Sequence, residues 1–230
     1  IEKIDRKVKN CEDFCVDIAK EIIKSQKTGN KSYVRLKADF TTERKKFDKK
    51  VQKTYELYAD AIVTKEKVYK SIGCSAVGLN ACPCAQETIK ENTIKKLKEE
   101  FSDEEIEKII NLIPLVTHNQ RVKIKLIVTT EENEHVELED LIDIVENSFS
   151  SEIFEMLKRP EEAKIVEIAH RNPLFVEDSI RRVMKNFYDR YKNLKTAKIS
   201  TTVESFESIH PHNAIAKTEI SIDELRKIFE

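Results

Sequence analysis

Two cysteines separated by one proline, Cys82-Pro83-Cys84, have the spacing best suited to chemistry in this chain. Two thiols so close together, with proline stiffening the turn, can present one sulfur to a metal ion while the other stays nearby. A lone Cys-x-Cys pair lacks the second pair of a structural zinc ribbon, so any further metal ligands would be histidine or carboxylate. The pair is therefore suited either to metal binding or to catalysis.

Most of the histidines lie in two short polar runs, residues 117–121 and 208–213, each beside a predicted strand. A histidine in a loop at a strand end is easily directed into a pocket. The histidines in these runs are His118, His210 and His212. His135, in a very acidic turn, and His170, near a helix end, are interpreted as surface residues outside any site.

One cysteine, one histidine and one carboxylate would leave an open fourth position on a tetrahedral metal ion, as in a catalytic site. Aspartate and glutamate number 42, so composition does not choose among them. Spacing points to Glu161 and Glu162 in one predicted helix start, and to Glu177 and Asp178 in another. Acidic residues also stabilise helix N-termini, so a purely structural interpretation stays open.

The elements that must position these residues follow from hydrophobic periodicity. Period-two alternation predicts strands at 32–40, 55–63, 68–79, 122–129, 197–203 and 214–220. Helical spacing predicts helices at 1–25, 85–100, 103–112, 137–158, 161–171 and 176–191, and a short one at the end. Ser102 and Glu105 have capping-box spacing. Cys11 and Cys15 lie on the apolar stripe of the first helix, which predicts core residues.

The order of the elements predicts an α+β fold built from ββααββ units. Residues 70–220 read strand, strand, helix, helix, strand, strand, with extra helices between the first two strands. We therefore interpret residues 1–65 as the back half of a first unit without its opening strands. Residues 66–230 form a second unit, with a helical insertion at 86–114.

Composition excludes several classes of function. The 230 residues carry 41 basic and 42 acidic side chains, a net charge of −1, so we expect neither nucleic acid nor membrane as a partner. With 3 glycines there is no GxGxxG or phosphate-binding P-loop motif. Five cysteines without signal-peptide features predict a cytoplasmic protein. Because the chain opens at Ile1 in helical pattern, we expect its true N-terminus to lie upstream.

Five runs, in order, resemble the metal-dependent GTP cyclohydrolases of type IB, closest to their archaeal, methanopterin-pathway branch. They are Ala81-Cys82-Pro83-Cys84, His118-Asn119-Gln120-Arg121, Leu157-Lys158-Arg159-Pro160-Glu161-Glu162, Asn172-Pro173-Leu174-Phe175-Val176-Glu177-Asp178 and Glu204-Ser205-Phe206-Glu207-Ser208-Ile209-His210. The resemblance implies the tunnelling fold, in which tandem ββααββ units form antiparallel sheets with helices on one face. It also implies a homo-oligomeric barrel, a dimer or tetramer, with active sites at subunit interfaces.

The resemblance implies a role for each residue that matches a motif. The metal ligands would be Cys82, His118 and Glu162. Glu177 would anchor the guanine of GTP, and Arg121 would bind its phosphates. The groups that orient the reactants and transfer protons would be Cys84, Glu207 and His210, with His212 as a further candidate. In the implied reaction, water activated by the metal attacks C8 of the guanine, formate leaves, and a 7,8-dihydroneopterin phosphate forms.

The long helical segment between the cysteine pair and His118 matches the archaeal branch. It therefore favours Fe(II) as the cofactor, with Zn or Mn as substitutes, and a 2',3'-cyclic phosphate product. Two other functions stay open. A tunnelling-fold nitrile reductase of the queuosine pathway would need NADPH and no metal. A non-enzymatic interaction module would use the cysteines and a histidine as a structural zinc site.

Overall fold

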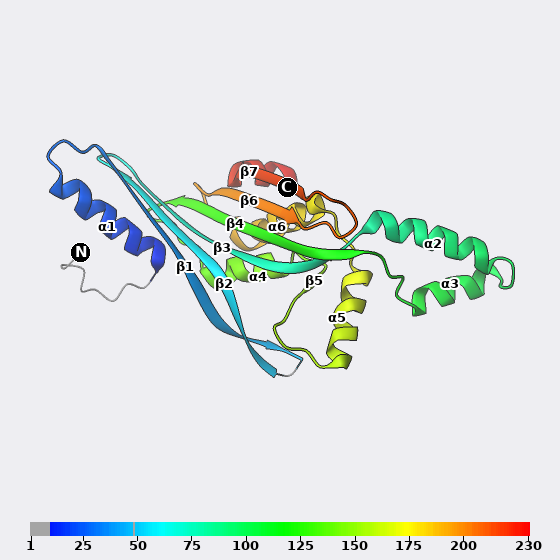
Figure 1. The fold of residues 1–230 in the computed structure, drawn as a ribbon. Helices are drawn as coiled ribbons and strands as arrows, with labels where there is room; N and C mark the ends of the chain where they lie inside the picture. Colours follow the sequence, from blue (N-terminus) through cyan, green and yellow to red (C-terminus); the bar gives the residue numbers. More distant parts are fainter. Residues whose placement is uncertain (1–9, 48) are drawn as a thin grey trace.

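The computed structural model describes residues 10–47 and 49–230, and within them seven strands form one antiparallel sheet in the order β1-β2-β3-β4-β6-β7, with β5 paired to β3 (Figure 1). The strands are β1 (Lys31–Lys46), β2 (Lys49–Thr64), β3 (Val68–Ala81), β4 (Asn119–Glu131), β5 (Ser151–Glu152), β6 (Lys198–Ser205) and β7 (Ala214–Ser221). The helices are α1 (Cys11–Ser25), α2 (Pro83–Leu97), α3 (Asp103–Leu112), α4 (Leu138–Glu146), α5 (Arg159–Arg171), α6 (Val176–Tyr191) and α7 (Ile222–Phe229).

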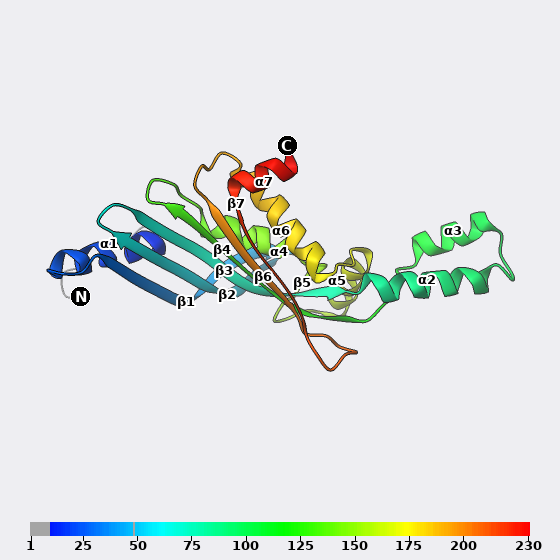
Figure 2. The ribbon, with the colours of Figure 1, turned by 90° about the horizontal axis from the view of Figure 1, so that it is seen from above.

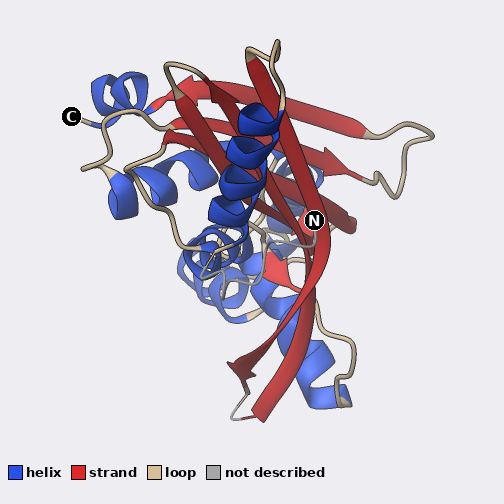
Figure 3. Cartoon of the chain, turned by 90° about the vertical axis from the view of Figure 1, so that its left-hand side faces the viewer, coloured by secondary structure: helices blue, strands red, loops and turns tan. Residues whose placement is uncertain are grey.

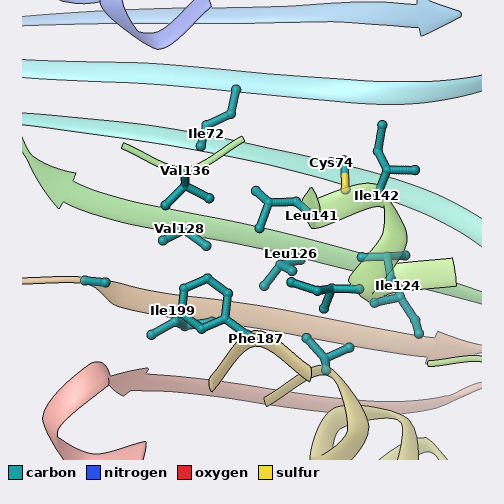
Figure 4. Packing of buried hydrophobic residues seen from close by; sticks show 14 of the residues in the cluster. Ile72, Cys74, Ile124, Leu126, Val128, Val136, Leu141, Ile142, Phe187 and Ile199 are labelled. Carbon is teal, nitrogen blue, oxygen red and sulfur yellow. The ribbon is translucent and has the colours of Figure 1, made fainter. Parts of the chain in front are cut away.

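Helices α1, α4 and α6 pack on one face of the sheet, where the core lies (Figures 1 and 3). Strand residues alternate between faces, so every second residue of β4, from Val122 to Val128, is buried against the helices. Figure 4 shows Ile124, Leu126 and Phe187 within this layer. The core also takes in Cys15, whose pKa is raised to about 11 by burial, as expected for a structural thiol.

The opposite face of the sheet is polar, and Glu56 lies at the centre of a group of hydrogen bonds on it. Its carboxylate accepts from Lys123, from Lys37 at 2.6 Å and from Ser75 at 2.6 Å. These donors hold the pKa of the Glu56 carboxyl well below its ordinary value of 4.5. Folding therefore favours the ionised form of Glu56.

Substituting Glu56→Gln is expected to lower the free energy of unfolding at neutral pH and to have less effect as the solution becomes acidic. Because the folded-state pKa is depressed, the stabilisation is present above pH 4.5 and is lost as the pH falls through the folded-state value. Urea unfolding of both proteins between pH 3 and 7 measures this, with Glu43→Gln, from an exposed ion pair with Lys50, as the control. An equal effect of Glu56→Gln at all pH values would contradict the lowered pKa of the Glu56 carboxyl.

Helices α2 and α3 form an arm that extends beyond the end of the sheet (Figure 2). Within α2 no residue is buried, and in α3 only Ile106 is. The predicted capping box at the start of α3 is confirmed, since Ser102 Oγ accepts from the Glu105 backbone N–H and the Glu105 carboxylate accepts from the Ser102 N–H at 2.9 Å. The arm thus begins at the cysteine pair and returns to the body just before His118.

The helix predicted over residues 137–158 is wrong in its second half, because α4 ends at Glu146. The next residues turn back, and β5 pairs with β3, placing Glu152 opposite Gly78. A Cβ at Gly78 would overlap the ring of Phe149, so glycine is required where this turn crosses β3. Gly78 therefore serves this packing contact.

The α+β fold with an antiparallel sheet and helices on one face is confirmed, as are the other predicted elements within the described residues. The strands predicted at 32–40 and 55–63 are longer than expected, since β1 continues to Lys46 and β2 begins at Lys49. The predicted start of the first helix, over residues 1–9, lies outside the described residues. Strands from both predicted units join one sheet, and the division of the chain near residue 65 stays a prediction. Among the described helices, none has the length and apolar character needed to span a membrane.

Candidate active site

A cavity of about 320 Å³ lies where the end of β3, the start of α2, the start of β4 and the segment entering α6 meet the β6–β7 connection. Six of the residues that line it are ones that the sequence analysis identified as candidate site residues. Those residues are Cys82, Cys84, His118, Glu177, Glu207 and His210. The structure therefore brings together six predicted site residues that lie up to 128 positions apart in the chain (210 − 82).

Cys82 and His118 are neighbours because β3 and β4 end side by side. Ala81 lies opposite Asn119 in the ladder, and the Cys82 N–H donates to the His118 carbonyl at 3.0 Å. Cys82 is the N-cap of α2 and Pro83 occupies the first turn, where a missing N–H is not needed. A thiol and an imidazole thus leave adjacent strand ends toward one cavity.

The ring of His118 is oriented by a chain of hydrogen bonds that ends at Glu207. Gln120 Nε2 donates to Glu207 Oε1 at 3.4 Å, which places the Gln120 carbonyl oxygen toward His118. That oxygen lies 3.1 Å from His118 Nδ1, so it accepts a proton held there. Ser205 Oγ also donates to Glu207 Oε1, at 2.7 Å. In this arrangement the Nε2 lone pair of His118 is free for a metal ion or a proton.

Two acidic residues lie at the start of each of α5 and α6, and in each pair one caps its helix while the other does not. Asp178 accepts from the Phe175 N–H at 3.1 Å, and Glu161 accepts from the Lys158 N–H at 2.7 Å. These two residues fill the structural role that was left open. Neighbouring Glu162 and Glu177 cap nothing, and neither carboxylate has a hydrogen-bond or ion-pair partner within the described residues.

Of these two residues, only Glu177 is among those that line the cavity. Glu162 is exposed on α5 and is not among the cavity residues. In the described part of the chain, no group of three or more His, Cys, Asp or Glu side chains is arranged to hold a metal ion. The structure therefore places two predicted ligands, Cys82 and His118, together and does not bring Glu162 to them.

Arg121 does not line this cavity either. It follows Gln120 in β4, and successive side chains of a strand point to opposite faces. Arg121 instead lines a larger cleft, of about 820 Å³, with Lys53, Lys123 and Lys158 among its walls. Lys53 and Lys123 there are paired with glutamates, whereas the guanidinium of Arg121 has no partner among the described residues.

The remaining histidines differ in their surroundings. His212 stacks on His210 with ring centres 5.4 Å apart but does not line the cavity. His135 is partly exposed and ion-paired, as expected for the surface. The surface interpretation of His170 is wrong, because this residue is 4% exposed. Its Nε2 lies 3.0 Å from the Thr117 carbonyl, so His170 supports the segment that leads into His118.

Three polar residues of the cavity had no predicted role, Asn80, Gln120 and Ser205. Gln120 lies inside a run that the sequence had already singled out, and its position two residues after His118 on a strand predicts the same side of the sheet. Asn80 has no local signal in the sequence. It is recognised only from its buried contacts.

The fold and this cavity define a tunnelling-fold protein with a site lined by cysteine, histidine and glutamate residues. Among solved structures, the chain is similar to uricase from Arthrobacter globiformis, with a TM-score of 0.52 and 8% identity over 93% of this chain and 71% of that one. At this identity the likeness establishes the fold alone.

Sequence comparison gives the family. Residues 1–216 match the family described as type I GTP cyclohydrolase folE2. The chain is 36% identical to GTP cyclohydrolase MptA 1 of Methanocella arvoryzae, covering 98% of this chain and 73% of that protein. It is 33% identical, with the same coverage, to GTP cyclohydrolase MptA of Methanothermobacter thermautotrophicus. The chain belongs to the type I GTP cyclohydrolase folE2 family, and its assignment to type IB stays a prediction.

Proposed function

We propose that this protein is a GTP cyclohydrolase of methanopterin biosynthesis that opens the guanine ring at C8, releases formate and forms a 7,8-dihydroneopterin phosphate. The observation that carries the proposal is the convergence of Cys82, His118 and the free carboxylate of Glu177 on one cavity. Relatives named GTP cyclohydrolase MptA support the same reaction.

Glu177 is proposed to anchor the guanine. The ring N1–H and the exocyclic amine of guanine are adjacent donors, and one carboxylate has two oxygens that can accept from both. Because no protein group in the described residues occupies the Glu177 carboxylate, it is available for this pairing. Phe175 lies on the same wall of the cavity and adds apolar surface beside the carboxylate.

Cys82 and His118 are proposed to hold a metal ion, and Glu162 stays the predicted third ligand. A thiolate and an imidazole are donors that both ferrous iron and zinc accept, so this part of the site fits such an ion. A bound ion of this kind supplies a nucleophilic water near neutral pH by lowering the pKa of that water. Fe(II) is our proposed cofactor, with Zn or Mn as substitutes.

Glu207, His210 and Cys84 are proposed to handle protons. Releasing formate breaks two C–N bonds at C8, and each freed nitrogen must gain a proton. His210 and Cys84 lie on the cavity wall, where a side chain can donate to such a nitrogen. Glu207 accepts from Ser205 and Gln120, so its position is fixed relative to His118.

Arg121 is kept as the proposed phosphate-binding residue. Since it faces away from the Glu177 cavity of its own chain, the proposal requires a homo-oligomer in which its cleft meets the cavity of a neighbouring copy. The cyclic phosphate form of the product is part of the same proposal.

The proposed reaction is tested with anaerobically purified protein, Fe(II) and GTP. We expect one formate released per GTP consumed, a fluorescent pterin after oxidation of the product, and loss of both on chelation of the metal. Phosphorus NMR of the product separates a cyclic phosphate from a triphosphate. Metal-loaded protein that leaves GTP intact would rule the proposal out.

A further inference from the structure

Asn80 is a buried polar residue beside the cavity, and it does none of the proposed chemistry. It lies two residues before Cys82 and is 1% exposed. Its Nδ2 donates to Ser179 Oγ at 3.0 Å and to the Leu174 carbonyl at 3.4 Å. Its Oδ1 accepts from the Ser150 N–H at 3.0 Å. The amide therefore uses both of its ends, which fixes its orientation.

The two acceptors of Asn80 lie on either side of Glu177. Leu174 precedes Glu177 by three residues and Ser179 follows it by two. The Leu174 N–H also donates to the Ala81 carbonyl at 3.0 Å, so backbone and side chain tie the same two segments. The end of β3 is thus attached to both ends of the segment that carries Glu177.

Further hydrogen bonds, made by Ser150 and Asn172, support this connection. Ser150 Oγ accepts from the Ala81 N–H at 3.2 Å. Asn172 Nδ2 donates to the Ser150 carbonyl at 3.1 Å, and its Oδ1 accepts from Arg182 at 2.6 Å. Buried and mutually satisfied polar groups of this kind rigidify a structure, because any one that loses its partner is costly.

We propose that Asn80 is a positioning residue that sets the separation between Cys82 and Glu177, and through it the placement of guanine C8 relative to the Cys82 end of the site. The proposal rests on the proposed function. It follows from the connectivity, since the Asn80 side chain joins β3, which ends immediately before Cys82, to the first turn of α6. A misplacement of about 1 Å between reacting groups can cost about 100-fold in rate.

The test is Asn80→Asp, which keeps an oxygen for the Ser150 N–H and removes the amide donor to Leu174 and Ser179. We expect kcat for formate release to fall about 10- to 100-fold, as for other supporting residues behind an active site. We expect the GTP dissociation constant of the metal-free protein to rise, and the metal content after reconstitution to stay at the wild-type level. Asn186→Asp is the matched control, because Asn186 also donates to a buried serine, Ser148, but does not contact β3 through its side chain.

A double-mutant cycle separates positioning from general destabilisation. If Asn80 acts through Glu177, Asn80→Asp will change GTP affinity much less in a Glu177→Gln background than in the wild type. Additive effects, or wild-type kinetics of Asn80→Asp, would overturn the proposal. If Asn80→Asp does not fold, Ser179→Ala, which removes one acceptor, should show the same changes to a smaller extent, and wild-type kinetics there would overturn it. A wild-type protein that releases no formate would instead count against the proposed function.

Discussion

Replacing Cys82 by serine is expected to remove the bound metal ion and to lower formate release by more than about 1,000-fold. Cys82 is the proposed thiolate ligand, and it shares the cavity with His118. Without the ion, the pKa of the attacking water returns toward that of bulk water, and the nucleophile is lost near neutral pH. Metal analysis of the anaerobically prepared variant and a formate assay measure the two effects.

Other cysteines of the chain provide the controls for Cys82→Ser. Cys11 is partly buried on α1, where burial raises the pKa of its thiol, and Cys11→Ser should keep both metal and activity. Cys84→Ser should keep the metal and lose activity, because Cys84 is proposed to move a proton. Full metal content in Cys82→Ser would contradict the ligand assignment, whatever the activity.

Local periodicity predicted most of the fold because most elements bury one face against a single layer. The alternation of buried and less buried residues from Val122 to Val128, and the helical spacing of buried residues in α6, both result from that burial. The prediction of one helix over residues 137–158 was wrong because tertiary contacts end the helix at Glu146. No glycine or proline interrupts that stretch, and the turn after Glu146 is fixed by a hydrogen bond from the Ser150 N–H to Asn80 Oδ1 and by Phe149 packing on Gly78. Such partners are remote in sequence.

The part of the site that could be predicted from the sequence consists of residues at the ends of strands and at the starts of helices. The resemblance carried by the ordered motifs led us to expect that Cys82, His118 and Glu177 share one site, and in the structure Cys82 and His118 flank the ends of neighbouring strands while Glu177 lies at the start of a helix. The position of α5 relative to the cavity depends on tertiary packing, which motif spacing does not give, and Glu162 does not line the cavity of its own chain. Alternation along β4 did hold information that was missed, since Arg121 must face away from Gln120.

Replacing Glu177 by glutamine is expected to weaken GTP binding about 100- to 10,000-fold while leaving the metal content unchanged. The variant keeps the shape of the side chain but turns one of two acceptors into a donor that faces the donors of guanine. Hydrogen bonds to a charged group contribute about 1.5–3 kcal/mol each; in the variant one is replaced by a contact between two donors and the other is made to an uncharged oxygen. Equilibrium binding of GTP to the metal-free protein measures this directly. Asp189→Asn is the control, because Asp189 lies on the same helix and, among the described residues, pairs with Lys185 alone.

The choice of base gives a sharper test of the same carboxylate. Inosine triphosphate lacks the exocyclic amine, so the wild type should bind it about 10- to 150-fold more weakly than GTP, the value of one such hydrogen bond. Glu177→Gln should lose most of this discrimination, because its remaining acceptor cannot serve both donors. Equal discrimination in the variant and the wild type would show that another group recognises the amine. Because Cys82→Ser should lose metal but keep this preference for GTP, the two variants separate base recognition from metal binding within one cavity.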